Sequence, residues 1–125
     1  MKVLFLARAG NESPWLEDFR ASLGDAYDVV LWSAQRPFAE QVEGAVAIAD
    51  LGAPLNQEMF AAARAAGISL WQIIGAGSDH IDRAWVTPEG FPIANIPGPQ
   101  SARALAEHAL MLMLTIARRF RLTQE

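Results

Sequence analysis

The 125-residue chain contains no cysteine. This absence excludes disulfide bonds, thiol catalysis and thiolate metal sites from the chain, and it fits a reducing cytoplasm. The two histidines, His80 and His108, are far apart in the sequence and have no partners at metal-ligand spacing. We therefore expect no resident metal and a cytoplasmic protein.

An excess of positive charge and a long apolar run are also missing. Ten Lys and Arg stand against 14 Asp and Glu, and the net charge of −4 argues against a nucleic-acid partner. The longest apolar run, residues 109–117 interrupted by Thr115, is shorter than the ~18–20 residues that span a bilayer. With 52% hydrophobic and 19% charged residues, the chain can still bury the core of one domain, and we expect no membrane insertion.

Apolar runs alternate regularly with helical patterns. Ser13, Asn56 and Ser101 are suited to capping the first, third and last full helices, with Pro14 at the first helical position of the first one. The alternation predicts an α/β fold, a five-stranded parallel sheet with helices on both faces, followed by a long apolar C-terminal helix. The strands are expected at 2–7, 28–32, 45–49, 70–74 and 91–96, and the helices at 14–23, 38–42, 56–66, 82–86 and 101–121.

Ligands of such sheets bind at the carboxyl ends of the strands, which here selects the loops 8–14, 50–54 and 75–79. In the last of these, Gly75 and Gly77 flank one small residue. Glycine has no Cβ and tolerates positive φ, so this loop can leave several N–H groups bare for a carboxylate or phosphate. A tight strand-to-helix turn explains the same pattern equally well.

Known chemistries of related sheets match these loops poorly. Loop 8–14 lacks the hydroxyl- and glycine-rich phosphate loop of a flavin protein. A receiver domain needs four conserved charged positions, of which only Asp50 is in place, and we interpret Asp50 as a loop or capping carboxylate. The dinucleotide fingerprint Gly-X-Gly-X-X-Gly has His80 where its third glycine belongs, so no dinucleotide site is expected in the chain.

The histidines allow a catalytic and a structural interpretation. His80 lies next to Asp79 and near Asp82, which permits a catalytic dyad, but Asp residues in such positions more often cap turns. His108 follows Glu107 inside an apolar helix, where a polar group is usually hydrogen-bonded rather than reactive. We favour the structural interpretation for both.

Three motifs resemble, in their order and spacing, the D-isomer-specific 2-hydroxyacid dehydrogenases, a family that includes glyoxylate, hydroxypyruvate and phosphoglycerate dehydrogenases. They are Ile-Gly-Ala-Gly-Ser-Asp-His-Ile-Asp at 74–82, Ile-Ala-Asn-Ile-Pro-Gly at 93–98 and Leu-Ala-Glu-His at 105–108. The resemblance implies a flavodoxin-like substrate domain at 1–97. It also implies a hinge and an interdomain or dimerisation helix at 98–125.

The resemblance also implies roles for individual positions. The implied substrate-binding residues are Leu51, Gly52, Gly75, Ala76, Gly77 and Ser78. The implied hinge residues are Asn95, Pro97 and Gly98, and the residues implied to border the nicotinamide are Ala104, Leu105 and His108. One extra residue between Pro97 and Glu107, relative to the family pattern, shifts this last assignment by one position.

The family's dinucleotide domain, with its catalytic Arg, Glu and His, is expected beyond Glu125, and neither His80 nor His108 matches the catalytic histidine. The resemblance therefore implies no catalytic residue and no bound cofactor in this chain, with NAD(P) belonging to the full-length enzyme. We expect an inactive fragment that binds a small 2-hydroxy or 2-keto acid weakly. A free-standing flavodoxin-like ligand-binding or receiver-like signalling module, and a structural fragment without a ligand, are the alternatives.

The last helix has apolar residues around its whole circumference, and a helix of this kind is normally buried on all sides. We therefore expect a homodimer through residues 101–121, formed by exchanging this helix across Pro97-Gly-Pro99.

Overall fold

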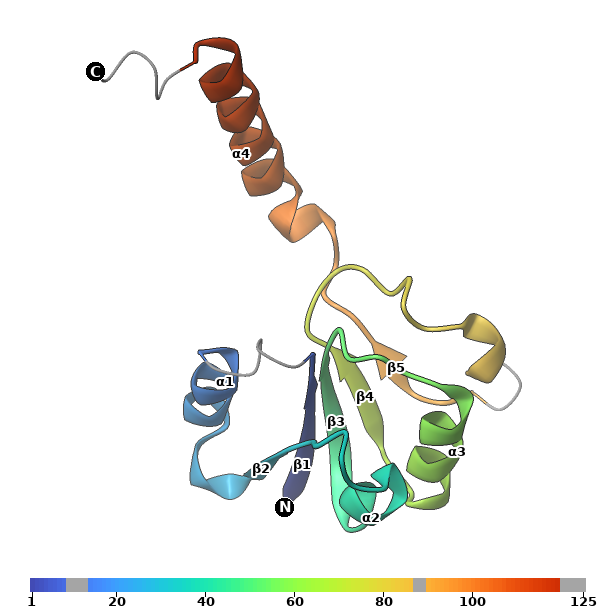
Figure 1. Ribbon diagram of the computed structural model, residues 1–125. Coiled ribbons are helices and arrows are strands. Elements are labelled where there is room, and N and C mark those ends of the chain that lie inside the picture. Colours follow the sequence, from blue (N-terminus) through green and yellow to red (C-terminus); the bar gives the residue numbers. More distant parts are fainter. Residues whose placement is uncertain (9–13, 87–89, 120–125) are drawn as a thin grey trace.

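The computed structural model describes residues 1–8, 14–86 and 90–119 (Figure 1). Its strands form one five-stranded sheet in the order β2-β1-β3-β4-β5, and each neighbouring pair is parallel. This is the strand order of flavodoxin-like folds, so the expected five-stranded parallel sheet is confirmed. The strands are β1 (Lys2–Ala7), β2 (Asp28–Leu31), β3 (Ala45–Leu51), β4 (Leu70–Ile73) and β5 (Ile93–Ala94).

Helices cover both faces of the sheet, with α1 on one side and α2 and α3 on the other (Figure 1). The helices are α1 (Trp15–Leu23), α2 (Phe38–Val42), α3 (Gln57–Ala65) and α4 (Pro99–Ala117). Two 3-10 turns, η1 (Gly24–Ala26) and η2 (Arg83–Trp85), complete the described elements.

Two apolar cores lie on the opposite faces of the sheet. Successive residues of β1 alternate between them, with Leu4 facing the α2–α3 side and Phe5 the α1 side, which explains why this strand is apolar throughout. The larger core centres on Trp71, which is fully buried and stacks on Phe60 of α3 at 4.4 Å between ring centroids. The end of β4 is therefore held rigidly at the sheet's carboxyl edge.

Some predicted boundaries are confirmed and others are wrong. The Asn56 side chain caps α3 by accepting the Met59 N–H at 2.9 Å, as expected. Pro14 precedes α1 instead of opening it, and Ser13 lies outside the described residues. The last helix begins at Pro99, and Ser101 is already inside it, its hydroxyl donating to the Gly98 carbonyl at 3.3 Å.

The fifth strand has only two residues where six were expected, because the chain leaves the β4 ladder after Ala94. Beyond that point the Ile96 N–H donates to the Gly75 carbonyl at 2.9 Å, past the end of β4. The predicted turn at 82–86 is the 3-10 turn η2.

The helix α4 projects away from the sheet (Figure 1), and its cover by a second copy stays a prediction. Leu105 is 65% exposed and Ile116 76%, because no other described segment packs around the helix. Its first half carries Arg103, Glu107 and His108, so the apolar part is shorter than the helix itself. Across the described ranges we find no helix with the length and hydropathy needed to cross a membrane.

Candidate anion site at the carboxyl edge of the sheet

The turn after β3 and the loop after β4 lie side by side at the carboxyl edge of the sheet. The Ile74 N–H donates to the Asp50 carbonyl at 2.7 Å, and the His80 imidazole contacts the Asp50 carboxylate at 2.9 Å. The implied substrate-binding residues Leu51–Gly52 and Gly75–Ser78 therefore meet at one place. The third predicted loop, at 8–14, falls largely outside the described residues.

The Gly-rich loop offers N–H groups that the protein does not use. Within 1–8, 14–86 and 90–119, the N–H groups of Ala76, Gly77 and Ser78 donate to no protein acceptor. Ala76 and Gly77 are exposed, and Ser78 is half-buried. Three consecutive donors at a solvent-facing loop are suited to a carboxylate or phosphate.

The carbonyl side of this loop is fixed to the segment that follows β5. The Gly75 carbonyl accepts the Ile96 N–H at 2.9 Å, and the Ala76 carbonyl accepts the Asn95 side-chain amide at 2.8 Å. Because a peptide carbonyl and the N–H of its own unit point in opposite directions, these two bonds turn the following N–H groups away from residues 95–96. The sequence suggested a hinge at Asn95, Pro97 and Gly98, but it gave no signal for this contact.

The glycines of the loop have no internal reason to be glycine. Gly75 and Gly77 do not adopt positive φ, and a Cβ at either position would meet no atom within 4 Å. The tolerance of glycine for positive φ is therefore not used in this loop. By contrast, Gly52 has φ of 73°, where a side chain would be strained. Close approach of a ligand is an explanation for Gly75 and Gly77 that does not depend on the fold.

Asp50, at the end of β3, is fully buried and is the hub of the hydrogen bonds at this edge. Its Oδ1 accepts the N–H groups of Gly52 and Ala53 at 2.9 and 3.1 Å. Its Oδ2 accepts the Trp71 indole N–H at 3.2 Å and contacts His80 Nε2 at 2.9 Å. The interpretation of Asp50 as a capping carboxylate is confirmed, and its burial leaves no room for phosphoryl transfer to it.

His80 pairs with Asp50 and not with its sequence neighbours, so its partner was missed. Asp82 caps the following turn by accepting the Ala84 N–H at 2.8 Å, as the structural interpretation predicted. The available signal was a single acidic residue in the otherwise apolar strand β3, because a buried carboxylate must find donors nearby.

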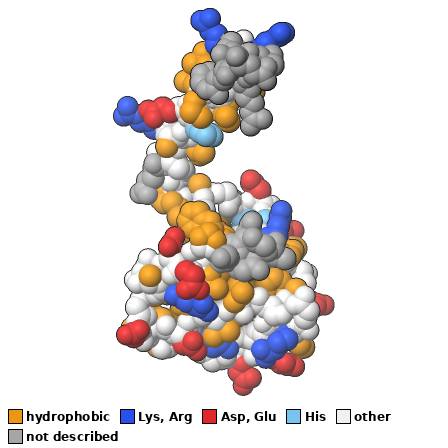
Figure 2. Space-filling model, turned by 60° about the vertical axis from the view of Figure 1, so that its left-hand side comes forward, with side chains coloured by type: hydrophobic (Ala, Val, Ile, Leu, Met, Phe, Trp, Pro, Cys, Tyr) orange, Lys and Arg blue, Asp and Glu red, His pale blue; other side chains and the backbone are white. Residues whose placement is uncertain are grey.

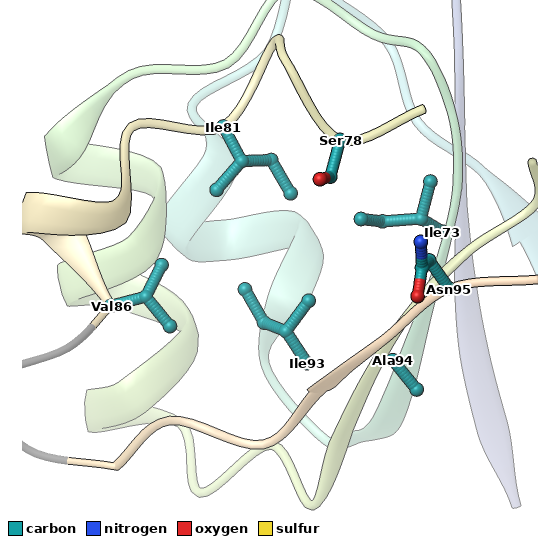
Figure 3. Close-up of a pocket in the computed structure, with 7 residues that line it drawn as sticks. All are labelled: Ile73, Ser78, Ile81, Val86, Ile93, Ala94 and Asn95. Atoms are coloured by element: carbon teal, nitrogen blue, oxygen red, sulfur yellow. The ribbon is translucent and has the colours of Figure 1, made fainter. Parts of the chain in front are cut away.

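An apolar cavity of about 260 Å³ lies beneath the loop (Figure 3). Ser78 and Asn95 add polar groups to a lining that is otherwise aliphatic. The residues that line the cavity are Ile73, Ser78, Ile81, Val86, Ile93, Ala94 and Asn95.

The residues implied to border a nicotinamide are not brought to this edge. Ala104, Leu105 and His108 lie exposed on α4, which points away from the loops (Figure 1). The expected burial of His108 inside a helix interior is therefore wrong. Within the described part of the chain, no cluster of three or more His, Asp or Glu is placed to hold a metal ion.

The residues present do not fit the pyrophosphate of a dinucleotide. After β4 the chain continues through an irregular loop to the three-residue turn η2, so the Gly-rich loop does not lead directly into an α-helix as a pyrophosphate-binding loop does. A nicotinamide cofactor would have to be held by residues other than these.

Comparison with known proteins identifies the family. Residues 9–125 match the family model described as D-isomer specific 2-hydroxyacid dehydrogenase, catalytic domain. The chain belongs to this family. Erythronate-4-phosphate dehydrogenase of Shewanella baltica is 31% identical over 124 residues, which cover 96% of this chain and 30% of that enzyme. The chain thus spans about a third of the length of this relative.

Solved structures of two dehydrogenases share the fold. D-lactate dehydrogenase from Escherichia coli superposes with a TM-score of 0.68 at 18% identity, covering 97% of this chain and 38% of that one. NAD-dependent formate dehydrogenase from Staphylococcus aureus, in complex with NAD, gives 0.68 at 20% identity, covering 97% and 40%.

Proposed function

We propose that this chain forms the carboxylate-binding wall of an NAD(P)-dependent D-2-hydroxyacid dehydrogenase. In this proposal residues 1–97 are the substrate domain, residues 98–125 are the hinge and the interdomain helix, and the enzyme is cytoplasmic. The observation that carries the proposal is the run of three unused N–H groups at Ala76, Gly77 and Ser78. The family supplies the substrate class, a small 2-hydroxy or 2-keto acid.

The role of this wall is to bind and orient the substrate. Backbone N–H groups that donate to a carboxylate make charge-assisted hydrogen bonds and carry no rotamer entropy of their own. The bound acid would then present its C2 carbon away from the loop, toward whatever faces this edge. In this proposal the general acid and the cofactor site belong to another part of the enzyme, so we expect the 125-residue chain to bind its ligand weakly and to show no turnover.

A titration of the isotope-labelled chain with oxalate and glyoxylate tests the proposal. We expect the amide resonances of Ala76, Gly77 and Ser78 to move, while that of Gly44, in the turn before β3 at the opposite edge, stays fixed. Gly77→Ala is the matched variant, since the new Cβ meets no protein atom but stands beside the donors. It should weaken binding by about tenfold or more, the worth of one charge-assisted hydrogen bond.

Three results would contradict the proposal. The first is an unchanged spectrum at millimolar oxalate, and the second is equal binding by the Gly77→Ala variant. The third is oxidation or reduction of a 2-hydroxy or 2-keto acid by the purified chain with a nicotinamide, which would show that a second wall is not needed.

We also propose that α4 pairs with the α4 helix of a second copy. Figure 2 shows hydrophobic side chains on the projecting helix, where Leu110, Met111 and Leu114 are all at least half exposed. One hollow on this helix is lined by Glu107, Leu110, Met111, Leu114, Thr115 and Arg118.

The lining of this hollow is self-complementary. An antiparallel partner related by a two-fold axis near residues 112–113 would place Met111 against Leu114 of the second copy. The same axis would place Glu107 against Arg118 of the second copy, so that opposite charges meet at both ends. Domain exchange across Pro97-Gly-Pro99 offers one route to this arrangement.

Light scattering of the chain across a concentration series tests this pairing. We expect a dimer that Leu114→Glu converts to a monomer, because the substitution buries a charge at the centre of the contact. A monomer at the highest concentration would refute it, and so would a dimer that survives the substitution.

A further inference from the structure

We propose that His80 is a positioning residue. Through the buried Asp50 carboxylate it fixes the Gly-rich loop 75–80 against the turn 51–53, at the spacing that the anion site requires. The ligand in this inference rests on the proposed function, whereas the link between the two loops does not.

The hydrogen bonds of Asp50 join three segments of the chain. The two backbone donors come from the turn at Gly52 and Ala53, the indole donor comes from Trp71 in β4, and the imidazole comes from the Gly-rich loop. The carboxylate is fully buried, whereas the His80 side chain is 28% exposed. His80 therefore connects the outer loop to a buried, immobile anchor.

The Gly-rich loop is held from two sides. On the β5 side, the carbonyls of Gly75 and Ala76 accept from Ile96 and Asn95. On the β3 side, the described residues provide two polar contacts. The Ile74 N–H donates to the Asp50 carbonyl, and the His80 side chain contacts the Asp50 carboxylate. Without the His80 contact, the exposed stretch 76–79 would be anchored along one edge, and its N–H groups could turn relative to Gly52.

The contact also sets which nitrogen of the ring carries a hydrogen. A carboxylate is an acceptor only, and Trp71 and the two backbone groups are donors only, so His80 Nε2 must donate to Asp50 Oδ2. In the neutral form of the ring Nδ1 is then an acceptor, and Nδ1 has no protein partner within the described residues. This tautomer is a signature that a histidine packed only for its shape would not show.

Two substitutions separate the positioning role from general packing. In His80→Gln the side-chain amide lies where Nε2 lay and can still donate to Asp50. In His80→Asn the amide lies where Nδ1 lay, so a polar group of similar size remains but the tie is lost. Asp25→Asn, at an exposed site in η1, is the control for a neutral surface change.

The experiment records amide spectra of all four proteins without ligand and then during an oxalate titration. We expect His80→Asn to move the Gly52 and Ala53 amide resonances before any oxalate is added, and to weaken oxalate binding by about tenfold or more. His80→Gln should keep both close to the wild type. The ring nitrogen shifts of wild-type His80 should report a hydrogen on Nε2.

Equal effects of the Gln and Asn substitutions would overturn the proposal, as would a wild-type ring that carries no hydrogen on Nε2. Unmoved Gly52 and Ala53 resonances in His80→Asn would also overturn it. If the wild-type chain does not respond to oxalate, the proposed function fails instead. In that case the ligand-free spectra and the ring tautomer still decide whether His80 holds the two loops together.

Discussion

Removing the Asp50 carboxylate should destabilise the chain more than removing any exposed charge. The Asp50→Ala variant leaves four donors without an acceptor, and two of these contacts, to the Ala53 N–H and the Trp71 indole, are buried. Each buried donor that loses its partner costs about 1–3 kcal/mol. The Gly52 and His80 donors are part-buried and can reach water, so they add less. We expect a loss of about 2–6 kcal/mol in the free energy of unfolding.

Urea denaturation followed by tryptophan fluorescence and far-ultraviolet circular dichroism measures this loss. With a denaturant dependence of roughly 2 kcal/mol per molar urea, the midpoint should fall by about 1–3 M. Asp50→Asn is the matched variant. It keeps an oxygen for the Gly52 and Ala53 N–H groups but turns an amide donor toward Trp71, so its midpoint should lie between those of the wild type and Asp50→Ala.

The reasoning is refuted if Asp50→Ala unfolds within about 1 kcal/mol of the wild type. Such a result would mean that water enters the edge of the sheet and satisfies the abandoned donors.

Two further substitutions test the fold. Phe60→Ala removes a ring that is 1% exposed and stacked on Trp71, and should cost about 3–5 kcal/mol in a urea titration; a cost below about 1 kcal/mol would contradict the described core. Gly52→Ala places a side chain at φ of 73° and should lower the free energy of unfolding by about 1–2 kcal/mol. At Gly75 the φ is not positive and a Cβ meets no atom within 4 Å, so Gly75→Ala should leave the unfolding midpoint unchanged. Equal midpoints for these two variants would show that the glycine conformations are assigned wrongly.

The sheet could be predicted from the sequence because its signals are local. A strand buried on both faces is a continuous apolar run, and an Asn before a helix supplies its own cap, so β1 and the start of α3 were predicted correctly. The short β5 was not, since its length depends on where the chain leaves the β4 ladder, and this happens after Ala94, before Ile96 bonds to Gly75. The end of β5 is set by a tertiary contact, which the residues of the strand itself do not encode.

The position of the Gly-rich loop at the carboxyl edge was predicted, but its contacts were not. The carboxyl-edge rule and the glycines identified the loop, whereas the pairing of His80 with Asp50 joins residues 30 positions apart. Asp79 and Asp82 lie much closer to His80 in the sequence. Proximity in the sequence therefore predicted the wrong partner, because the buried Asp50 carboxylate competes for the same imidazole N–H. The apolar circumference of α4 likewise shows that the helix needs cover without showing what covers it.

The length of α4 has a mechanical consequence. At 1.5 Å per residue, the 19 residues of α4 extend about 28 Å. A rotation of about 10° around Pro97–Gly98 would therefore displace the C-terminal end of the helix by about 5 Å. Asn95, whose side-chain amide donates to the Ala76 carbonyl, lies two residues before Pro97. A rotation of the helix about Pro97–Gly98 would therefore act on the segment that holds the Ala76 carbonyl.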